Sequence, residues 1–514
     1  MRRESSFSRR AVLQAGGVAA GAVLGQPGSA APRAGENVFT RLGVRPFINM
    51  TATYTINGGA PMLPEVRQAM EEAAEYAVNL DELMEKAGER IAALLGAEAC
   101  MVSSGCAAAL VHATAACMAG GDPEKMKQLP DSRGLRDEVI MPKQSRNDYD
   151  HAFRAPGARI VEVDTLEEFH AALGIRTAMV AVLGVGEAAG KMRLEQMAEA
   201  AHKHGVPVLV DAAAELPWKP NPYLSRGADL AGYSGGKILR GPQSAGLLLG
   251  RKDLVQAAWL HSAPHHALGR PMKVSKEEVV GMVAAIEYWA AKRKIEEEYR
   301  TWERWYGLIS DEITKVPGVA ARLLPPKGAS PFPVLEVSWD PERVKLTGGE
   351  LYRLLMDGEP RIMSHAGGEL SSFVIRAVAM KPEHPPMVAR RLAEVFREAS
   401  NAPRRAAPAP PQVELTGAWE ADLKFVSGAA RHTLVFSPPR GGSGNRIAGT
   451  QIGRSARGPL SGKLEGNQVR FRGVLVVEGM RLQYSFSGTV SGDSMSGEVE
   501  LGEFGRGSWT ARRS

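Results

Sequence analysis

One lysine in this chain stands among residues that favour covalent cofactor chemistry. Lys237 lies in a glycine-rich run, 231–246, which reads Ser-Gly-Gly-Lys-Ile-Leu-Arg-Gly-Pro-Gln from Ser234 onward. The apolar segment 206–210 precedes this run and ends on Asp211. A lysine amine forms a Schiff base with the aldehyde of pyridoxal phosphate (PLP), and a carboxylate keeps the pyridine nitrogen protonated so that the ring accepts electrons. The lysine and the aspartate together predict a PLP site.

A second segment has the features of a phosphate-binding turn. The run Ser-Ser-Gly-Cys-Ala-Ala-Ala at 103–109 lies between an apolar segment, 99–102, and a helix expected to run to about Met118. The first turn of a helix has free backbone N–H groups and a dipole that favours an anion. An ordinary helix with a capping serine is the alternative interpretation, because such caps are common.

Between residues 60 and 300, helical and strand patterns alternate. Helices are predicted at 65–78, 81–95 and 194–204, and buried strands at 159–163, 177–183 and 206–210. This alternation predicts an α/β fold with a mostly parallel sheet, whose ligands bind at the carboxyl ends of the strands. Asp211 falls at such an end, and Lys237 follows in a loop that returns toward it.

Five segments, in this order, resemble one group of PLP enzymes. The chain is similar to the L-seryl-tRNA selenium transferase and D-glucosaminate-6-phosphate ammonia-lyase group of fold-type I, which is aminotransferase-like. The similarity runs from about residue 38 to about residue 400, and the segments that carry it are 103–105, 146–151, 210–217, 234–243 and 269–277. The resemblance is specific for the group and much less specific for the substrate.

The resemblance implies roles for the residues around the cofactor. Lys237 would carry the Schiff base, and Asp211 would pair with the pyridine nitrogen. The phosphate would be held by residues at the start of the helix, with a hydroxyl from the lysine segment near it: Ser104, Gly105, Cys106 and Ser234. The same resemblance implies a homodimer or higher oligomer, because fold-type I enzymes build the site across a subunit interface.

Three further residues are candidates with open alternatives. His151 lies where the family could place a side chain over the cofactor ring, and a capping or buried histidine is the alternative. Arg270 or Arg376 would bind the substrate carboxylate, since a guanidinium offers a planar two-pronged match to it. For each arginine, a surface ion pair is the alternative.

Residues 1–34 have the pattern of an export signal rather than of a folded segment. Ser-Arg-Arg-Ala-Val-Leu at 8–13 is a twin-arginine pattern, followed by an apolar stretch at 11–24 and small residues at 28–31. The stretch is too short and too rich in Gly and Ala for a good membrane span. We expect a bacterial twin-arginine signal peptide at 1–34 and a periplasmic or secreted mature protein. A basic N-terminal extension is the alternative.

A proline-rich segment at 401–411 predicts a linker between two folded parts. Before it we expect a large PLP-binding domain at 38–300 and a small C-terminal domain of the same fold at 301–400. In the small domain, helices are predicted at 299–315, 348–356 and 386–399, and strands at 334–339 and 372–376. After the linker, residues 412–514 form a β-rich accessory domain.

The accessory domain has strand-like alternation with turn residues at hairpin spacing. The predicted strands are 417–425, 433–436, 468–477, 481–487, 494–500 and 507–511. This pattern predicts an up-and-down antiparallel barrel or a sandwich. The similar Gly-x-Trp segments that end at Trp419 and Trp509 favour first and last strands that lie side by side. No catalytic motif stands out here, so we expect a binding or spacer module.

Charge and composition argue against nucleic acid, a membrane and a metal as partners. The net charge is +6, and residues 1–34 carry five arginines and one glutamate, which leaves the rest near +2. So small a net charge is not typical of a protein that binds nucleic acid. No other apolar run approaches membrane-spanning length. The cysteines have neither a disulfide nor a zinc pattern: Cys100, Cys106 and Cys117. His261 and His265 are four residues apart, but Pro264 argues against a shared helix face.

The function predicted from these features is that of an exported PLP-dependent lyase. The reaction is α,β-elimination, of the ammonia-lyase type, on a small amino acid with a β-leaving group. A PLP-dependent aminotransferase or racemase would use the same residues and is the first alternative. A non-catalytic secreted binding protein that has kept the fold is the alternative from a different class.

Overall fold

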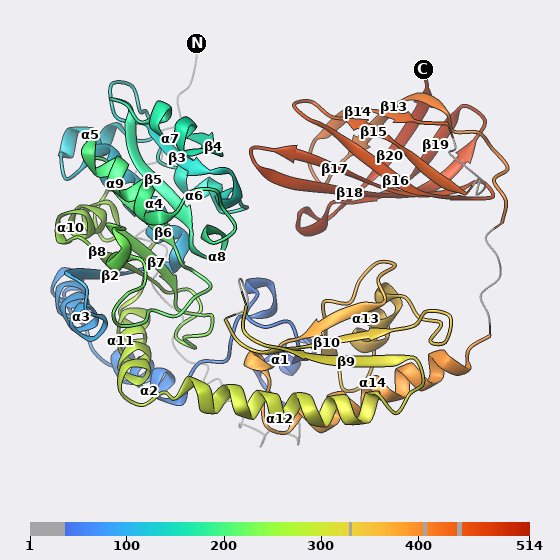
Figure 1. Ribbon diagram of the computed structural model, residues 1–514, viewed down its shortest axis with the longest axis horizontal. Helices are drawn as coiled ribbons and strands as arrows, with labels where there is room; N and C mark the ends of the chain where they lie inside the picture. The colour runs from blue at the N-terminus through green and yellow to red at the C-terminus, as the bar shows by residue number, and fades with distance from the viewer. Residues whose placement is uncertain (1–35, 328–330, 404–408, 439–444) are drawn as a thin grey trace, which may run out of the picture. The chain divides into compact units, whose positions relative to one another are not determined.

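The structure is a computed structural model that describes residues 36–327, 331–403, 409–438 and 445–514 (Figure 1). The described residues up to 46 belong to one compact unit, and those from 47 onward belong to a second. Helix α1 (Val38–Arg41) belongs to the first unit and has a capping box built on Asn37. The predicted signal peptide lies outside the described residues, as do residues 404–408 of the predicted linker.

A seven-stranded sheet forms the centre of the first part of the second unit (Figure 1). Its spatial order is β2-β8-β7-β6-β5-β3-β4. The bounds are β2 Ala99–Ser103, β3 Glu138–Pro142, β4 Arg159–Val163, β5 Thr177–Leu183, β6 Val208–Asp211, β7 Leu230–Ser234 and β8 Gly246–Gly250. Strands β7, β6, β5, β3 and β4 are parallel, whereas β8 is antiparallel to both of its neighbours. The predicted mostly parallel sheet is confirmed.

The central strands are apolar on both faces because helices cover both sides of the sheet. Every residue of β6 is buried, and so are the first six residues of β5. Helix α4 (Gly105–Ala119) buries twelve of its fifteen residues, so it lies within the protein rather than at its surface. The other helices of this part are α2 Pro64–Ala74, α3 Leu80–Leu95, α5 Pro123–Gln128, α6 Asp150–Arg154, α7 Leu166–Ala172, α8 Gly184–Glu187, α9 Leu194–Lys203, α10 Lys252–His261 and α11 Lys276–Ala291.

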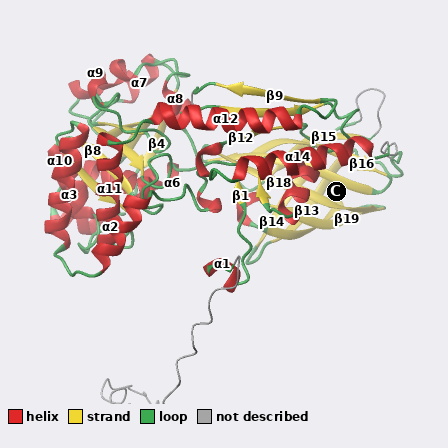
Figure 2. Cartoon of the chain, turned by 90° about the horizontal axis from the view of Figure 1, so that it is seen from below, coloured by secondary structure: helices red, strands yellow, loops and turns green. Residues whose placement is uncertain are grey.

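A smaller α+β part follows along the chain. A three-stranded antiparallel sheet has the order β12-β10-β9, with bounds β9 Val319–Leu324, β10 Val334–Trp339 and β12 Ser372–Ile375. The long helix α12 (Ile295–Ile313) packs against α14 (His384–Asn401) and β9 (Figure 2). Helix α13 (Gly348–Asp357) begins with a capping box at Thr347. The helices and strands predicted for this part are all present.

The N-terminal segment of the second unit joins the small part to the lysine turn. Strand β1 (Ile48–Asn49) pairs in parallel with β11 (Ile362–Met363), and Thr51 forms an isolated bridge with Arg376. Further along the same segment, the Ala60 N–H donates to the Gly236 carbonyl at 3.1 Å. This segment therefore contacts the end of β12 and the turn that contains Lys237.

Residues 417–513 form a closed eight-stranded antiparallel barrel. The strands are β13 Gly417–Lys424, β14 Ala429–Phe436, β15 Arg446–Ile452, β16 Arg457–Glu465, β17 Gln468–Val477, β18 Met480–Ser491, β19 Ser494–Glu500 and β20 Arg506–Arg513. First and last strands pair, with Ala421 opposite Ala511. The barrel has its own core, which includes Trp419, Phe471, Phe486 and Trp509. Of the two predicted β architectures, the barrel is therefore confirmed.

The two ends of the glycine-rich run 231–246 belong to strands, β7 and β8, that were not predicted. The run begins within β7 and ends at the first residue of β8, and these strands are antiparallel with Ser234 opposite Gly246. Lys237 therefore lies in the connection between two paired strands.

Within the described residues, no helix combines the length and the apolar character that crossing a bilayer requires.

Candidate active site

Asp211 is a buried carboxylate at the carboxyl end of β6. Its side chain is only 5% exposed, and its Oδ1 accepts a hydrogen bond from the Ala213 N–H at 3.1 Å. Burial raises the pKa of Asp211, and the Ala213 amide and the positive charge of Lys237 act against that rise. The two residues predicted to hold the reactive parts of PLP therefore interact electrostatically in the folded chain.

The lysine turn depends on glycines that allow close backbone approach. A Cβ on Gly236 would lie 2.3 Å from Gln243 Cα, which real structures do not tolerate. The Gly235 N–H donates to the Ala245 carbonyl at 2.8 Å, and this bond joins the two ends of the turn just before β8 begins. The turn holds Lys237 partly exposed, next to the strand end that carries Asp211.

The start of α4 lies beside this turn because β8 pairs with both neighbouring strands. Gly246 is opposite Ser103 of β2 on one side and opposite Ser234 of β7 on the other. Ser104 is the N-cap residue of α4, yet its hydroxyl makes no capping bond, and Gly105 has a φ of 81°. The sheet thus brings Ser104, Gly105 and Ser234 together, as the predicted phosphate site requires.

The Cys106 thiol points toward Asp211. Its Sγ lies 3.7 Å from Asp211 Oδ1, within hydrogen-bond range for sulfur. Burial, first, and the negative charge of Asp211 raise the pKa of this thiol well above its usual value, so the thiol stays protonated and donates. The side chain therefore supports the carboxylate, and only the backbone of Cys106 remains for the predicted phosphate contact. Gly232 makes room for the sulfur, since a Cβ there would be 3.0 Å from Sγ.

In the predicted ring-stacking segment, Tyr149 is a second aromatic candidate, and this residue is 51% exposed. Burial raises the pKa of Tyr149, and the negative charge of Asp211 raises it further. The His151 side chain is exposed, and its Nδ1 lies 3.2 Å from Arg154 Nη2. Tyr149 was not among the predicted site residues, although it lies in the same segment, 146–151, and has an aromatic ring suited to stacking.

Of the two candidate arginines, Arg376 is the one connected to the lysine turn. Its backbone N–H donates to the Met50 carbonyl at 3.0 Å, in the segment that continues to Ala60 and the Gly236 carbonyl. Burial and the charge of Arg376 lower the pKa of His365, so a neutral imidazole lies beside the guanidinium. Arg270 is exposed and follows Gly269 near the end of a loop. The contacts therefore favour Arg376 for the substrate carboxylate.

The histidines near 261–266 bond to the protein itself. His261 Nε2 is 3.0 Å from the Gly120 carbonyl oxygen, and His265 Nδ1 is 3.0 Å from that of Trp259. His265 Nε2 also lies 3.2 Å from Asp81. Within the ranges that the structure describes, no three acidic, histidine or cysteine side chains are grouped as metal ligands would be.

The residues present fit PLP. A buried carboxylate, a lysine whose charge acts on it, and a helix start whose N-cap serine makes no capping bond meet where β2, β7 and β6 end and β8 begins. The carboxylate suits a protonated ring nitrogen, and the helix start suits a phosphate. This donor set matches the three polar ends of that cofactor.

Comparison with known proteins identifies the family. The aminotransferase class-V family model matches residues 155–321. A 5'-C-glycyluridine monooxygenase-decarboxylase from a Streptomyces species is 30% identical over 381 residues, which cover 71% of this chain and 93% of that protein. The chain belongs to the PLP-dependent selenium transferase and ammonia-lyase group.

Other relatives agree with this assignment. A D-glucosaminate-6-phosphate ammonia lyase from Salmonella typhimurium is 34% identical over 262 residues, covering 49% of this chain and 69% of that enzyme. The solved structure of a D-glucosaminate-6-phosphate ammonia-lyase matches with a TM-score of 0.63 and 26% identity, over 71% of this chain and all of that one. The predicted fold class and the predicted cofactor, PLP, are confirmed.

We predict that Cys106 tunes cofactor binding through Asp211. Cys106→Ala removes a donor to the carboxylate, and a hydrogen bond of this kind contributes roughly 0.5–1.5 kcal/mol. We expect PLP to bind about two- to tenfold more weakly, with Cys106→Ser nearer to the wild type. Because the thiol lowers the pKa of Asp211, the fall in affinity on acidification should begin at a higher pH in Cys106→Ala.

The measurement is equilibrium dialysis of PLP against each variant over a range of pH. Cys117→Ala serves as the matched control, because this half-buried thiol lies elsewhere on α4. Equal affinities and equal pH profiles for wild type and Cys106→Ala would contradict the assigned role.

Proposed function

We propose that this chain is a lyase that carries out α,β-elimination on a small amino acid with a β-leaving group and releases ammonia. The observation that carries the proposal is buried Asp211 at the end of β6, on which the charge of Lys237, just beyond the adjacent strand β7, acts. The family supports an enzyme, and one relative is named for an ammonia-lyase reaction. The substrate class is an inference from the residues and from that relative.

The chain's own residues then have defined tasks. PLP, when bound, withdraws electrons from the substrate Cα. The Asp211 carboxylate stabilises the proton on the ring nitrogen, and Cys106 keeps that carboxylate oriented. The Lys237 amine takes the proton from Cα, while the Arg376 guanidinium holds the substrate carboxylate in a two-pronged contact.

The elimination step must also supply a proton to the leaving group. When the C–H bond at Cα breaks, Lys237 holds that proton, and it delivers it to the β-oxygen as the Cβ–O bond breaks. One water therefore leaves the substrate. Hydrolysis of the product consumes one water and yields a 2-oxo acid and ammonia, so no amino acceptor and no oxidant is required.

Oxidative decarboxylation is a second candidate function. The relative that aligns over 93% of its length is named a monooxygenase-decarboxylase, a reaction class that consumes dioxygen and releases carbon dioxide. The same Asp211 and Lys237 would serve it, because both reactions begin by drawing electrons from the substrate Cα. Whether turnover requires dioxygen therefore distinguishes oxidative decarboxylation from α,β-elimination.

We predict ammonia release from 2-amino-3-hydroxy acids without dioxygen and without an added oxo acid. Holoenzyme under anaerobic conditions should turn over many times, because elimination needs only water. The readouts are ammonia, the 2-oxo acid and carbon dioxide. A strict requirement for dioxygen with carbon dioxide release would favour oxidative decarboxylation, and a single turnover that an oxo acid restarts would favour transamination.

The same reaction mixtures distinguish racemisation from elimination. A racemase returns the proton to Cα without loss of the β-group, so the amino acid would change configuration and no ammonia would appear. Chiral chromatography of the recovered amino acid makes this measurement. If the protein neither bound PLP nor turned over any of these amino acids, the result would favour the alternative of a non-catalytic binding protein.

We also propose that the protein is exported by the twin-arginine route and acts as a homodimer. The support for export is the sequence pattern at 8–13, and the support for a dimer is the resemblance to fold-type I enzymes. Changing Arg9 and Arg10 to lysine should reduce delivery across the inner membrane strongly, as measured by fractionation of cells that produce the full chain. Undiminished export of that double variant would contradict the proposed route.

A further inference from the structure

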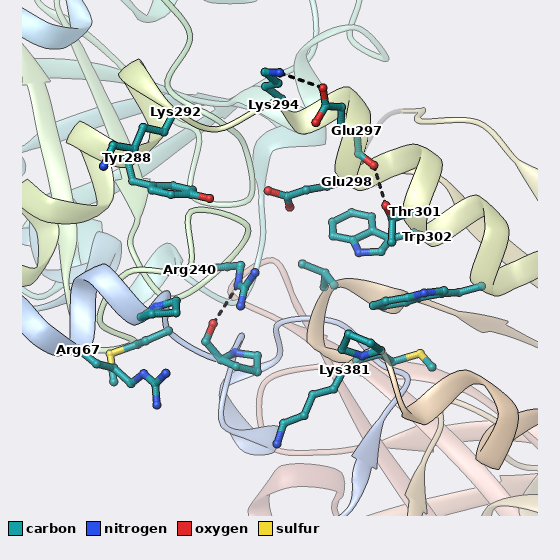
Figure 3. A pocket seen from close by; sticks show the side chains of 17 residues that line it. Arg67, Arg240, Tyr288, Lys292, Lys294, Glu297, Glu298, Thr301, Trp302 and Lys381 are labelled. Carbon is teal, nitrogen blue, oxygen red and sulfur yellow. Dashed lines mark hydrogen bonds and ion pairs between the residues drawn. The ribbon is translucent and has the colours of Figure 1, made fainter.

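A cleft of about 910 Å³ lies outside the cofactor site (Figure 3). Its walls come from the junction of α11 and α12, from the segment 61–67, and from residues 378–382 after β12. Arg240, from the lysine turn, also lines it. None of the residues assigned to PLP or to the substrate carboxylate lines this cleft, so it is a separate feature of the fold.

The cleft has an excess of positive charge. Its basic lining residues are Arg67, Arg240, Lys292, Lys294 and Lys381, and its acidic ones are Glu297 and Glu298. Glu297 is bound by Lys294 at 3.1 Å, and Glu298 makes a two-pronged contact of 2.7 and 2.9 Å with the buried Arg293. Both acids are thus already paired. Among the described residues, no ion pair involves the remaining four basic side chains.

Arg240 is partly buried, whereas Arg67, Lys292 and Lys381 are exposed. Figure 3 shows the Arg240 guanidinium between Tyr288 on one side and Trp302 on the other. Its Nε donates to the Pro61 carbonyl at 3.0 Å, so the side chain is fixed. Burial lowers the pKa of Arg240, with Glu298 acting against that fall. A guanidinium remains charged in such a place, and its other N–H groups can bind an anion.

The backbone of Arg240 is held in an unfavourable conformation. Its φ is 57°, in the left-handed region, which costs a non-glycine residue roughly 1 kcal/mol or more. The Leu63 N–H donates to the Arg240 carbonyl at 3.0 Å and helps to hold this conformation. Such a conformation persists only where the surrounding contacts hold it in place.

Aromatic side chains give the cleft a second kind of surface. Tyr288, Trp302 and Trp305 line it together with apolar residues of the small part, including Val378 and Met380. Flat rings of this kind bind flat or apolar groups of a ligand. Cations beside aromatic walls suit a molecule with a phosphate at one end and an organic body at the other.

We propose that this cleft is a binding site for a phosphorylated small molecule, with its phosphate on Arg240 and its organic part against Trp302. Lys292 and Lys381 at the exposed rim add long-range attraction. The proposal does not depend on which reaction the enzyme catalyses, because it concerns residues that the mechanism does not use.

The site is linked to the catalytic lysine by two contacts. The Arg240 N–H donates to the Lys237 carbonyl at 3.0 Å, within one turn. Arg293, which binds Glu298 of the cleft, donates from Nη1 to the Ile238 carbonyl at 2.5 Å. A ligand on Arg240 is therefore in contact with the turn that positions Lys237, so its binding should change the absorbance of the bound cofactor.

The test is calorimetric titration of the PLP-loaded enzyme with phenyl phosphate, so that the cofactor's own phosphate site is filled. Phenyl phosphate should bind saturably at one site per chain, more tightly than inorganic phosphate, and phenol should not bind. Arg240→Gln should weaken binding at least tenfold, and the double change of Lys292 and Lys381 to glutamine about threefold. Arg300→Gln is the matched control, because this exposed arginine on α12 does not line the cleft.

The double lysine variant keeps the proposal testable where Arg240→Gln fails to fold, since it leaves the lysine turn untouched. Competition between phenyl phosphate and a phosphorylated amino acid that the enzyme turns over would show that the cleft receives a distal phosphate of the substrate, and independent binding would show a separate effector. Both outcomes support the site. The absence of saturable binding, or binding that neither the Arg240 nor the double lysine variant weakens, would overturn it.

Discussion

A single buried carboxylate is the feature on which the site depends. Taking an ionised Asp211 out of water is costly, and the effective penalty for an unpaired buried charge is several kcal/mol. The fold offsets this cost with the Ala213 amide, the Cys106 thiol and the charge of Lys237. The bound cofactor would add a protonated ring nitrogen. That ring nitrogen would be a further partner for the Asp211 carboxylate.

The sheet explains how residues from distant parts of the chain reach this carboxylate. Antiparallel β8 lies between β2 and β7, so the ends of those strands meet across Gly246. A Cβ on Gly246 would lie 2.4 Å from the Cys106 backbone nitrogen, and this close approach brings the start of α4 to the lysine turn. The residues that would hold the phosphate, the ring nitrogen and the aldehyde of PLP therefore lie at different strand ends of one sheet.

Much of this could be predicted from the sequence, and the reasons differ between elements. Strands β4, β5 and β10 have the predicted bounds because each is an uninterrupted apolar or alternating run. Asp211 and Lys237 could be recognised because a strand that ends on an acid and a glycine-rich lysine turn are local patterns. Strand β8 was not predicted, because it is a short segment that begins at Gly246, the last residue of the glycine-rich run, and ends at Gly250.

The remaining features depend on tertiary contacts that no local pattern encodes. The direction of the Cys106 thiol is set by Gly232 on a neighbouring strand, and the environment of Tyr149 is set by Asp211. The basic cleft combines segments near residues 61, 240, 292 and 381, which no spacing rule connects. Local sequence patterns therefore predict the candidate cofactor residues better than the residues that surround them.

The most direct test of the central claim is to find which lysine carries the cofactor. PLP-loaded protein is reduced with borohydride, which fixes the cofactor to the amine that holds it, and is then digested and analysed by mass spectrometry. We predict that the added mass lies on the peptide containing Lys237 and disappears in Lys237→Ala. Cofactor fixed to another lysine, or no bound cofactor in the folded protein, would contradict the account.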